Sequence, residues 1–259
     1  MKKGILMVSF GTTYRDTREK NIERLAETVR ENFPHWKLYQ AYSSQRVRKV
    51  LEKRDHIRIP GIQEALLEML QEEITHVAVL PTHVMDGIEN NKMKHAVEEV
   101  RTLFTEVKIA GALLGEEADI TLVAGAIWEE IKEIAGDDPV VFMGHGSAHE
   151  ADQCYAELET ALRSSSGREI YIATVEGAVN IASVIERLAA EQKGKGRVLL
   201  LPLMLVAGDH AIHDMAGEEA SFASELKAAG YEPECILKGM GEYEGIREIY
   251  IEHLRKVID

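Results

Sequence analysis

The sequence predicts an α/β protein that consists of two similar halves, each built on a parallel sheet. Short runs rich in valine, isoleucine and leucine alternate along the chain with longer amphipathic stretches. Strands that are apolar on both faces and are separated by helices are typical of parallel sheets covered by helices on either side. A second observation is that two segments recur in the same order, and 259 residues are enough for two domains of ordinary size.

The expected strands are the short apolar runs, and the expected helices are the amphipathic stretches between them. The strands are residues 4–10, 37–42, 75–81, 107–110, 139–144, 169–174, 197–204 and 234–237. The helices are residues 17–32, 62–72, 90–103, 119–134, 150–163, 179–191, 217–229 and 245–257. No low-complexity or proline-rich linker interrupts this alternation.

The repeat indicates a duplicated α/β unit. Residues 8–12 parallel residues 143–147, and residues 79–87 parallel residues 200–208. We expect one domain at 1–136 and a second at 137–259, because Gly136 and the two aspartates after it break a helix there. In such sheets ligands bind beyond the carboxyl ends of the strands, so two domains that face each other would place these loops on either side of a cleft.

Composition excludes several classes of protein. The chain has 44 acidic and 30 basic residues, a formal charge of −14, which disfavours general nucleic-acid binding. The longest apolar run, 198–207, contains Pro202 and has about half of the roughly 20 residues that a membrane helix needs. Cys154 and Cys235 form no CxxC motif, which favours a reducing compartment and a cytoplasmic location.

Three candidate metal ligands follow strands of the second half. His145 lies between two glycines after the strand at 139–144, Glu176 follows the strand at 169–174, and His210 follows the strand at 197–204. Two imidazoles and one carboxylate suit a divalent first-row metal and leave coordination positions open. Asp209 and Asp214 are candidates for orienting the imidazoles. The alternative is that these are surface residues that never meet, and we favour the shared site.

The first half has weaker candidates at equivalent places. His83 follows the strand at 75–81, and Glu89 lies where the repeat places the counterpart of His210. Each either lines the cleft or is structural, and the sequence does not decide between these roles. Phe10 is a candidate cleft wall, and Gly11, Thr12 and Thr13 follow it in a turn that is a weak candidate for binding an anion through backbone amides.

A basic segment lies within this acidic chain. Residues 44–54 have a net charge of +4, and Arg46, Lys49 and Lys53 are spaced to share one face of a helix. One interpretation is an ordinary solvated helix. The other is recognition of a carboxylate ligand, which suits the forked guanidinium of arginine.

Familiar catalytic motifs are absent from the sequence. The segment Gly144-His145-Gly146-Ser147 does not have serine at the centre of a G-x-S-x-G motif, so a hydrolase nucleophile is not indicated. The chain also has no Walker A sequence, and residues 144–149 lack the third glycine of a dinucleotide-binding fingerprint.

Several motifs closely resemble the anaerobic cobalt chelatases of the CbiK type. They are VFMGHG at 141–146, TVEG at 174–177 and LPLMLVAGDHAIHDM at 201–215, with VSFGTTY at 8–14, EKNI at 19–22 and GMGE at 239–242. The long motif that ends at Met215 is the most specific, and the resemblance runs over essentially the whole chain. It implies the fold of the wider class-two chelatases, with two flavodoxin-like domains around a cleft.

The resemblance also implies an activity. Members of this family insert Co²⁺ into sirohydrochlorin, or its oxidised relative factor II, in anaerobic cobalamin synthesis, without ATP or an organic cofactor. The family's metal-binding His, Glu and His match His145, Glu176 and His210, and His145 is also the candidate base for the pyrrole protons. A departure is His213, where the family carries Asn, and the resemblance leaves its role open.

We therefore expect a sirohydrochlorin cobaltochelatase whose partners are sirohydrochlorin and cobalt, with no nucleic acid or membrane. Its oligomeric state is open and a homo-oligomer is one alternative. Because affinity at such sites rises from Fe²⁺ through Co²⁺ to Ni²⁺, an iron or nickel chelatase is the nearest alternative function. A carrier that binds metal or tetrapyrrole without catalysis and a metal-assisted hydrolase are the alternatives from other classes.

Overall fold

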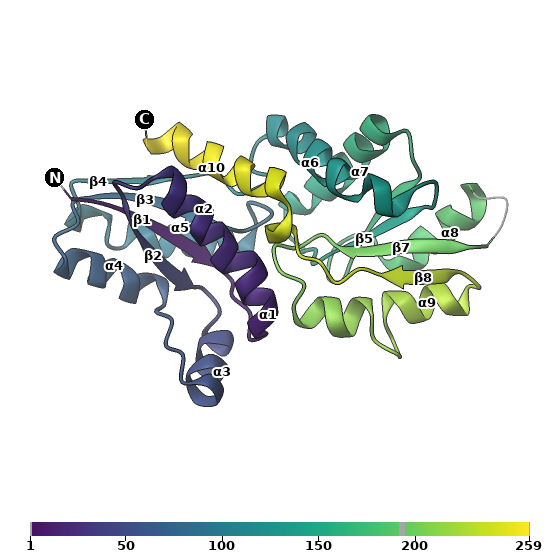
Figure 1. Ribbon diagram of the computed structural model, residues 1–259, viewed down its shortest axis with the longest axis horizontal. Coiled ribbons are helices and arrows are strands. Elements are labelled where there is room, and N and C mark those ends of the chain that lie inside the picture. The colour runs from purple at the N-terminus through teal and green to yellow at the C-terminus, as the bar shows by residue number, and fades with distance from the viewer. Residues whose placement is uncertain (1, 192–194, 259) are drawn as a thin grey trace. The chain divides into compact units, whose positions relative to one another are not determined.

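The computed structural model describes residues 2–191 and 195–258 of the chain. These residues form two compact units, Met1–Glu116 with Ile246–Asp259, and Glu117–Gly245. Each unit contains a four-stranded sheet in which every neighbouring pair of strands is parallel. The predicted α/β class with two parallel sheets is therefore confirmed (Figure 1).

The sheet of unit 1 has the order β2-β1-β3-β4. Its strands are β1 (Lys3–Ser9), β2 (Lys37–Tyr42), β3 (His76–Pro81) and β4 (Glu106–Ile109). Its helices are α1 (Arg15–Thr17), a π-helix at Arg18–Glu23, α2 (Arg24–Asn32), α3 (Gln45–Asp55), α4 (Ile62–Gln71), α5 (Ile88–Glu98), a 3₁₀ turn at Arg101–Leu103 and α10 (Glu244–Ile258).

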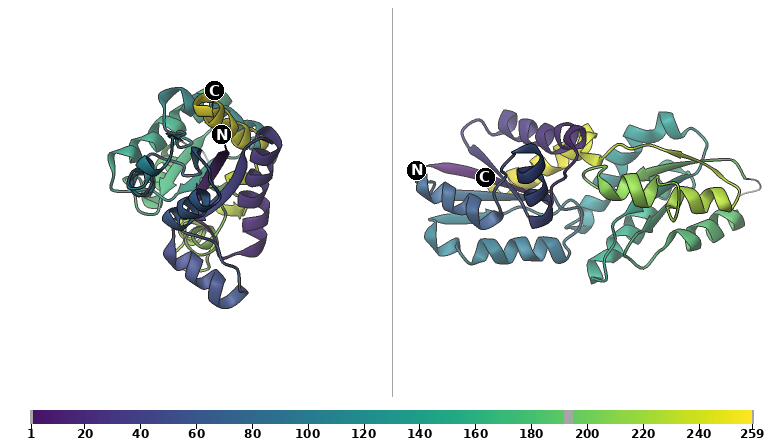
Figure 2. Two further views of the ribbon diagram at one scale, coloured as in Figure 1. Left: turned by 90° about the vertical axis from the view of Figure 1, so that its left-hand side faces the viewer. Right: turned by 90° about the horizontal axis from the view of Figure 1, so that it is seen from below.

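Alternate side chains of β1 point to opposite faces of the unit 1 sheet, and both faces are covered. Leu6 and Val8 pack into an apolar cluster with α4 and α5. The other face carries α2 and α10, and Figure 2 shows these two pairs of helices on opposite sides of the sheet. The apolar strands that the sequence shows are therefore buried between two layers of helix, as a parallel sheet requires.

The sheet of unit 2 has the order β6-β5-β7-β8. Its strands are β5 (Val140–Gly144), β6 (Ile170–Thr174), β7 (Arg197–Pro202) and β8 (Glu232–Cys235). Its helices are α6 (Glu117–Ala135), a 3₁₀ turn at Glu150–Asp152, α7 (Gln153–Ser166), α8 (Ile181–Glu191), a π-helix at Ala211–Met215, α9 (Phe222–Ala228) and a 3₁₀ turn at Met240–Glu242. In Figure 1, α6 and α7 cover one face of the sheet and α8 and α9 the other.

The two units are built on the same plan, as the sequence repeat predicts. In each sheet the first strand lies between the second and the third in chain order. The hydrogen bonds that close the strand ends also correspond: the amide of Thr82 donates to the carbonyl of Val8, and the amide of Leu203 donates to the carbonyl of Met143. Residues 8 and 143 differ by 135 positions and residues 82 and 203 by 121, as do the repeated segments to which they belong, so the repeat extends to individual backbone contacts.

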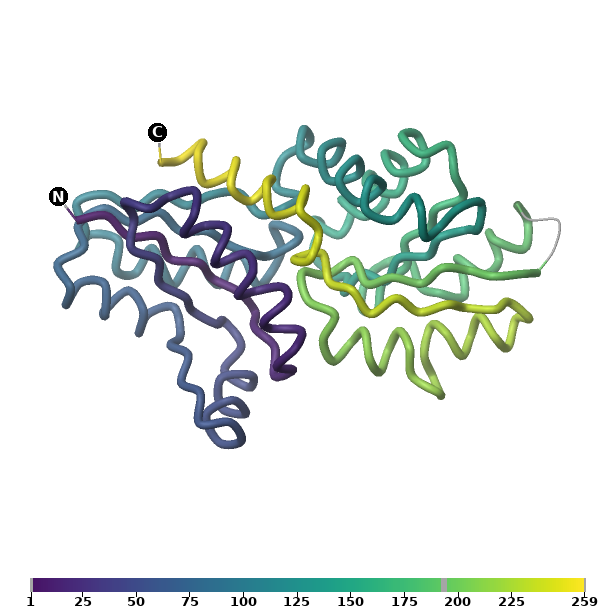
Figure 3. The backbone as a smooth tube through the Cα atoms, viewed as in Figure 1, coloured from purple at the N-terminus to yellow at the C-terminus, as the bar shows by residue number. Residues whose placement is uncertain are grey.

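The boundaries of the units differ from the predicted division at residue 136. Helix α6 packs against α7 and belongs to unit 2, so the first boundary lies at the start of this helix. The last helix, α10, returns to unit 1, where the guanidinium of Arg255 donates to the Asn32 side chain on α2 at 2.6 Å. Figure 3 shows the chain end running back along α2. A break in the helical pattern could not predict this, because the return depends on buried contacts distant in sequence.

None of the helices that the structure describes has both the length and the apolar character needed to span a membrane.

We predict that Tyr250→Phe destabilises unit 1 by about 1–3 kcal/mol, because a buried carbonyl would lose its donor. The Tyr250 hydroxyl donates to the carbonyl of Thr82 at 3.0 Å, and burial raises the pKa of Tyr250, so the hydroxyl keeps its proton. The free energy of unfolding in urea measures the effect. Tyr42→Phe is the matched control, since the hydroxyl of Tyr42 is buried without a partner and its removal should not destabilise. Equal losses in the two variants would contradict the prediction.

Candidate functional site

The carboxyl ends of the strands in unit 2 carry the three predicted metal ligands. His145 directly follows β5, Glu176 lies two residues after β6, and His210 precedes the π-helix that follows β7. The backbone connects two of them, because the amide of Glu176 donates to the carbonyl of His145 at 2.8 Å. The parallel pairing of β5 with β6 and β7 therefore brings all three loops to one edge of this sheet.

Gly146 allows the loop after β5 to contact the loop after β6. Its φ of +78° is in the left-handed region, which favours glycine. A Cβ at this position would lie 2.3 Å from the amide nitrogen of Gly177 and 2.6 Å from the Cβ of Thr174. The side chain of His145 is therefore presented by a turn that only glycine can complete.

Asp152 joins the same two loops through hydrogen bonds. Its Oδ1 accepts from the amide of Ser147 at 2.9 Å, and its Oδ2 accepts from the amide of Ala178 at 3.0 Å. These contacts hold together the segments that follow His145 and Glu176. Sequence reasoning missed this residue, and the signal available was an acidic residue at the start of the helix that follows the His145 loop.

His145 and His210 lie side by side. Their ring centroids are 4.8 Å apart and their planes are nearly perpendicular, at 88°. Nδ1 of His145 lies 2.9 Å from the carbonyl of Gly146, and Nδ1 of His210 lies 2.7 Å from a carboxylate oxygen of Asp214. A carbonyl or carboxylate can only accept, so Nδ1 carries the hydrogen in both rings and each Nε2 keeps a lone pair for a ligand.

Glu176 is placed beside this pair only through its backbone. Its side chain is exposed and makes no hydrogen bond or ion pair within the described ranges 2–191 and 195–258. In the same ranges no group of three or more His, Cys, Asp or Glu side chains is arranged to hold a metal ion. The structure therefore brings together two of the three predicted ligands and leaves the carboxylate of the third unengaged.

The two aspartates that were expected near the histidines each contact a different histidine. Asp214 contacts His210, as the sequence suggested for a residue that orients an imidazole. Asp209 instead contacts His213, whose Nδ1 lies 3.1 Å from its carbonyl and 3.3 Å from its carboxylate. His213 is exposed and has its own partner, so it is not part of the pair formed by His145 and His210.

The loop after β1 in unit 1 is built around a glycine and exposes a phenylalanine. The side chain of Phe10 is 51% exposed. Gly11 has φ of +96° and packs directly on the ring of Tyr42. The hydroxyl of Thr12 accepts from the amide of Tyr14, and the carbonyl of Thr13 accepts from the guanidinium of Arg54. The amide that directly follows the candidate anion turn is therefore already engaged within the loop.

The two other candidates of unit 1 lie after β3. Nδ1 of His83 is 3.2 Å from Oδ1 of Asn90, and burial lowers the pKa of the imidazole. Glu89 lies in the first turn of α5 and forms an ion pair with Lys92 at 2.6 Å. The negative charge of Glu89 also acts on His83, raising its pKa in opposition to burial.

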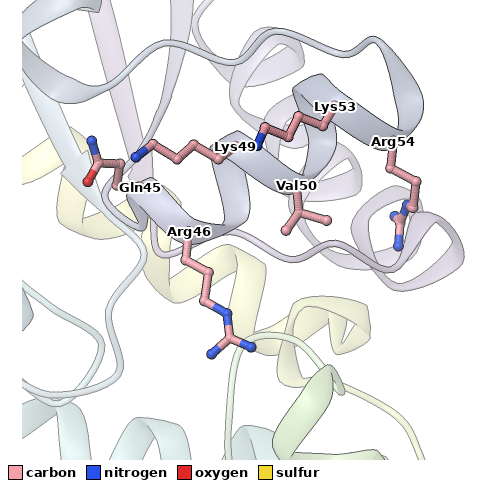
Figure 4. A pocket seen from close by; sticks show the side chains of 6 residues that line it. All are labelled: Gln45, Arg46, Lys49, Val50, Lys53 and Arg54. Carbon is pink, nitrogen blue, oxygen red and sulfur yellow. The ribbon is translucent and has the colours of Figure 1, made fainter.

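The basic segment forms α3, and its side chains line a surface hollow of about 450 Å³. Figure 4 shows two rows along the helix, Gln45, Lys49 and Lys53 in one and Arg46, Val50 and Arg54 in the other. Arg54 is paired with Asp55. Arg46, Lys49 and Lys53 make no ion pair with any residue that the structure describes, so this face holds three uncompensated positive charges.

A family model described as cobalt chelatase (CbiK) matches residues 3–259, almost the whole chain. The chain belongs to the CbiK cobalt chelatase family.

Two curated relatives agree with this assignment, and a solved structure shares the fold. A sirohydrochlorin cobaltochelatase of Salmonella typhimurium is 34% identical over 260 residues, covering 100% of this chain and 97% of the relative. The sirohydrochlorin cobaltochelatase CbiKC of Nitratidesulfovibrio vulgaris is 34% identical, with 99% and 91% covered. The solved structure of SirB from Bacillus subtilis with Fe³⁺ shares the fold, with a TM-score of 0.70 at 16% identity and 99% and 95% covered.

We predict that Gly146→Ala lowers the melting temperature of this CbiK chelatase far more than Gly167→Ala. Both glycines have positive φ, so both substitutions impose the left-handed strain of roughly 1–2 kcal/mol. Only at Gly146 would the new methyl group also meet backbone atoms, because nothing lies within 4 Å of a Cβ at Gly167. Differential scanning calorimetry compares the two variants, and similar melting temperatures would show that the two loops are not in close contact.

Proposed function

We propose that this protein is a sirohydrochlorin cobaltochelatase, which inserts Co²⁺ into sirohydrochlorin in cobalamin biosynthesis. The observation that carries the proposal is the pair of Nε2 lone pairs of His145 and His210 at the carboxyl edge of the unit 2 sheet, in a chain of the CbiK family. The reaction needs a site that holds a divalent metal weakly enough to release it. Two imidazoles with open positions meet that need.

In this proposal His145 and His210 bind Co²⁺, the substrate metal, through their Nε2 atoms. Asp214 accepts the Nδ1 hydrogen of His210 and so keeps the ring orientation and raises its basicity as a ligand. The carboxylate of Glu176 has no partner in the described structure and is the third ligand once its side chain rotates toward the metal. Three protein ligands leave open positions for the nitrogens of the tetrapyrrole.

Insertion replaces protein ligands by ring nitrogens and releases two protons from the pyrrole N–H groups. A histidine bound to metal has no free lone pair, so His145 accepts a proton only after its bond to cobalt breaks. Its Nε2 then takes one proton, and the Glu176 carboxylate takes the other. Each N–H bond breaks with its electron pair left on nitrogen, which then coordinates Co²⁺. The two protons that leave the ring balance the two positive charges of the Co²⁺ that enters it, so the step needs no ATP or organic cofactor.

We further propose that side chains of unit 1 contact the tetrapyrrole. Exposed Phe10 offers an apolar surface for a ring face, and the loop formed by Gly11, Thr12 and Thr13 continues from it. His83 and Glu89 lie at the carboxyl end of β3 in the same unit. A cytoplasmic location is also proposed, and it is supported by the free thiols of the two cysteines.

We predict that the purified protein turns over Co²⁺ and metal-free sirohydrochlorin, and that His145→Ala and His210→Ala each slow insertion by at least about 100-fold. Removal of a ligand should exceed the 10- to 100-fold losses typical of changes beside a ligand. The absorption spectrum of the macrocycle follows the reaction. His213→Ala is the matched control and should keep the rate, because His213 faces Asp209.

The same assay separates the alternatives. Faster insertion of Fe²⁺ or Ni²⁺ than of Co²⁺ would reassign the metal. Binding of metal and macrocycle without turnover would indicate a carrier. Normal cobalt insertion by His145→Ala would reject the proposed metal site.

We predict that combined Arg46→Gln and Lys49→Gln substitutions raise the KM for sirohydrochlorin about two- to tenfold and leave kcat unchanged. The substrate is a polycarboxylate, and exposed ion pairs contribute modestly and weaken with salt. The matched control replaces Lys20 and Arg30 by Gln, two exposed cations of unit 1 that do not line the α3 hollow. An unchanged KM, or an equal rise in the control, would show that α3 is an ordinary solvated helix that does not bind the substrate.

A further inference from the structure

The helix α3 is an insertion in unit 1 that unit 2 lacks. In unit 1 the amide of Tyr42, which ends β2, donates to the carbonyl of Pro60. In unit 2 the amide of Thr174, which ends β6, donates to the carbonyl of Val179. The equivalent bond therefore closes a loop that contains the whole of α3 in unit 1 and only residues 175–178 in unit 2. The helices that follow, α4 and α8, contact β2 and β6 alike, so the fold is complete without α3.

The insertion starts at the carboxyl edge of the unit 1 sheet. The N-cap of α3 is Ser44, whose hydroxyl accepts from the amide of Val47 at 3.3 Å. The amide of Ser44 donates to the carbonyl of Phe10, just as the amide of Glu176 donates to the carbonyl of His145. The insertion thus begins where unit 2 has its predicted carboxylate ligand. Parallel α/β sheets bind ligands at this edge.

Packing fixes one face of α3. Leu51 is the one buried side chain of this 11-residue helix, all of which the structure describes. The guanidinium of Arg48, on the same face, pairs with the carboxylate of Glu64 on α4 at 3.1 Å. One buried leucine and one partly exposed ion pair are few contacts for a helix of this length. Packing is therefore not a sufficient reason for the insertion.

The opposite face of α3 carries the three cations that have no ion pair among the described residues. Arg46, Lys49 and Lys53 follow the helical spacing i, i+3 and i+7, so they form a stripe about 10 Å long. Arg46 and Lys49 precede Arg48 and Leu51 by two positions, about 200° around the helix. Figure 4 shows the stripe among the side chains that line the hollow. Because like charges at this spacing repel each other, an anion bound in the hollow would stabilise the helix.

We propose that this stripe, Arg46, Lys49 and Lys53, binds neighbouring carboxylates on the rim of a tetrapyrrole. It thereby selects rings that carry both an acetate and a propionate on each pyrrole over rings that carry a methyl group in place of the acetate. The inference rests on the proposed function, which supplies the class of ligand, and it concerns residues of unit 1 alone. Acetate and propionate on adjacent carbons bring two carboxylates close together, which suits a row of cations with a forked guanidinium at one end. A ring with one propionate per pyrrole leaves part of the row unpaired.

The test compares two metal-free porphyrins by fluorescence titration. Uroporphyrin III has an acetate and a propionate on each pyrrole, and coproporphyrin III has a methyl and a propionate. We expect the wild-type protein to bind uroporphyrin about five- to tenfold more tightly, because each exposed ion pair contributes modestly. Combined Arg46→Gln and Lys49→Gln should lower the preference to about twofold by weakening uroporphyrin binding, and added Lys53→Gln should lower it further. The matched control, Lys20→Gln with Arg30→Gln, should keep the preference, because neither residue lines the hollow.

Salt provides a second measurement on the same proteins. Screening weakens exposed charge pairs, so the preference of the wild-type protein should fall toward that of the α3 variant between about 0.05 and 0.5 M NaCl. A preference that survives in the α3 variant, or that is lost equally in the control, would overturn the inference.

Cobalt insertion into sirohydrochlorin by the wild-type protein is measured on the same preparations. Normal insertion together with an unchanged preference in the α3 variant rejects this inference alone. A preference that depends on α3 without any insertion of cobalt rejects the proposed function alone.

Discussion

The parallel pairing of strands that are buried on both faces is the constraint on which the rest of this structure depends. Hydrogen bonding of β5 to β6 and β7 aligns the ends of three strands, so residues distant in sequence share one edge. Loops at that edge are free to carry polar groups, whereas the strands themselves are not. The contact between the rings of His145 and His210 follows from this alignment.

The loops need additional contacts to present these side chains. The left-handed turn at Gly146 lets two loops meet at backbone distance, and the carboxylate of Asp152 ties their amides together. Hydrogen bonds to a carbonyl and to a carboxylate then give both imidazoles the same tautomer. The chemistry of the proposed metal site is thus determined by partners of Nδ1 that never contact the metal.

The two units share one fold but carry different side chains at the carboxyl edges of their sheets. The three predicted metal ligands of unit 2 have counterparts of other types in unit 1: His145 corresponds to Phe10, Glu176 to Ser44 and His210 to Glu89. The backbone contact is the same in both units, because the amide of Ser44 donates to the carbonyl of Phe10 as the amide of Glu176 donates to the carbonyl of His145. Unit 1 also has polar groups that unit 2 lacks. A chain of hydrogen-bonded side chains ends at His83 in unit 1, whereas the equivalent side chains of unit 2 belong to the apolar core. The backbone plan is common to both units, and the side chains at its carboxyl edge differ between them.

Much of this protein was determined by its sequence alone. Apolar runs of strand length separated by amphipathic stretches are a local property. They predicted the strands and the parallel sheets, because a strand covered by helices on both faces is apolar on both. Strand-end positions were enough to select His145 and His210. Only the tertiary structure decided which groups meet: α10 returns to unit 1, Asp152 joins two loops, and Asn90 orients His83. These depend on distances between residues far apart in the chain, and neither periodicity nor motif spacing records such distances.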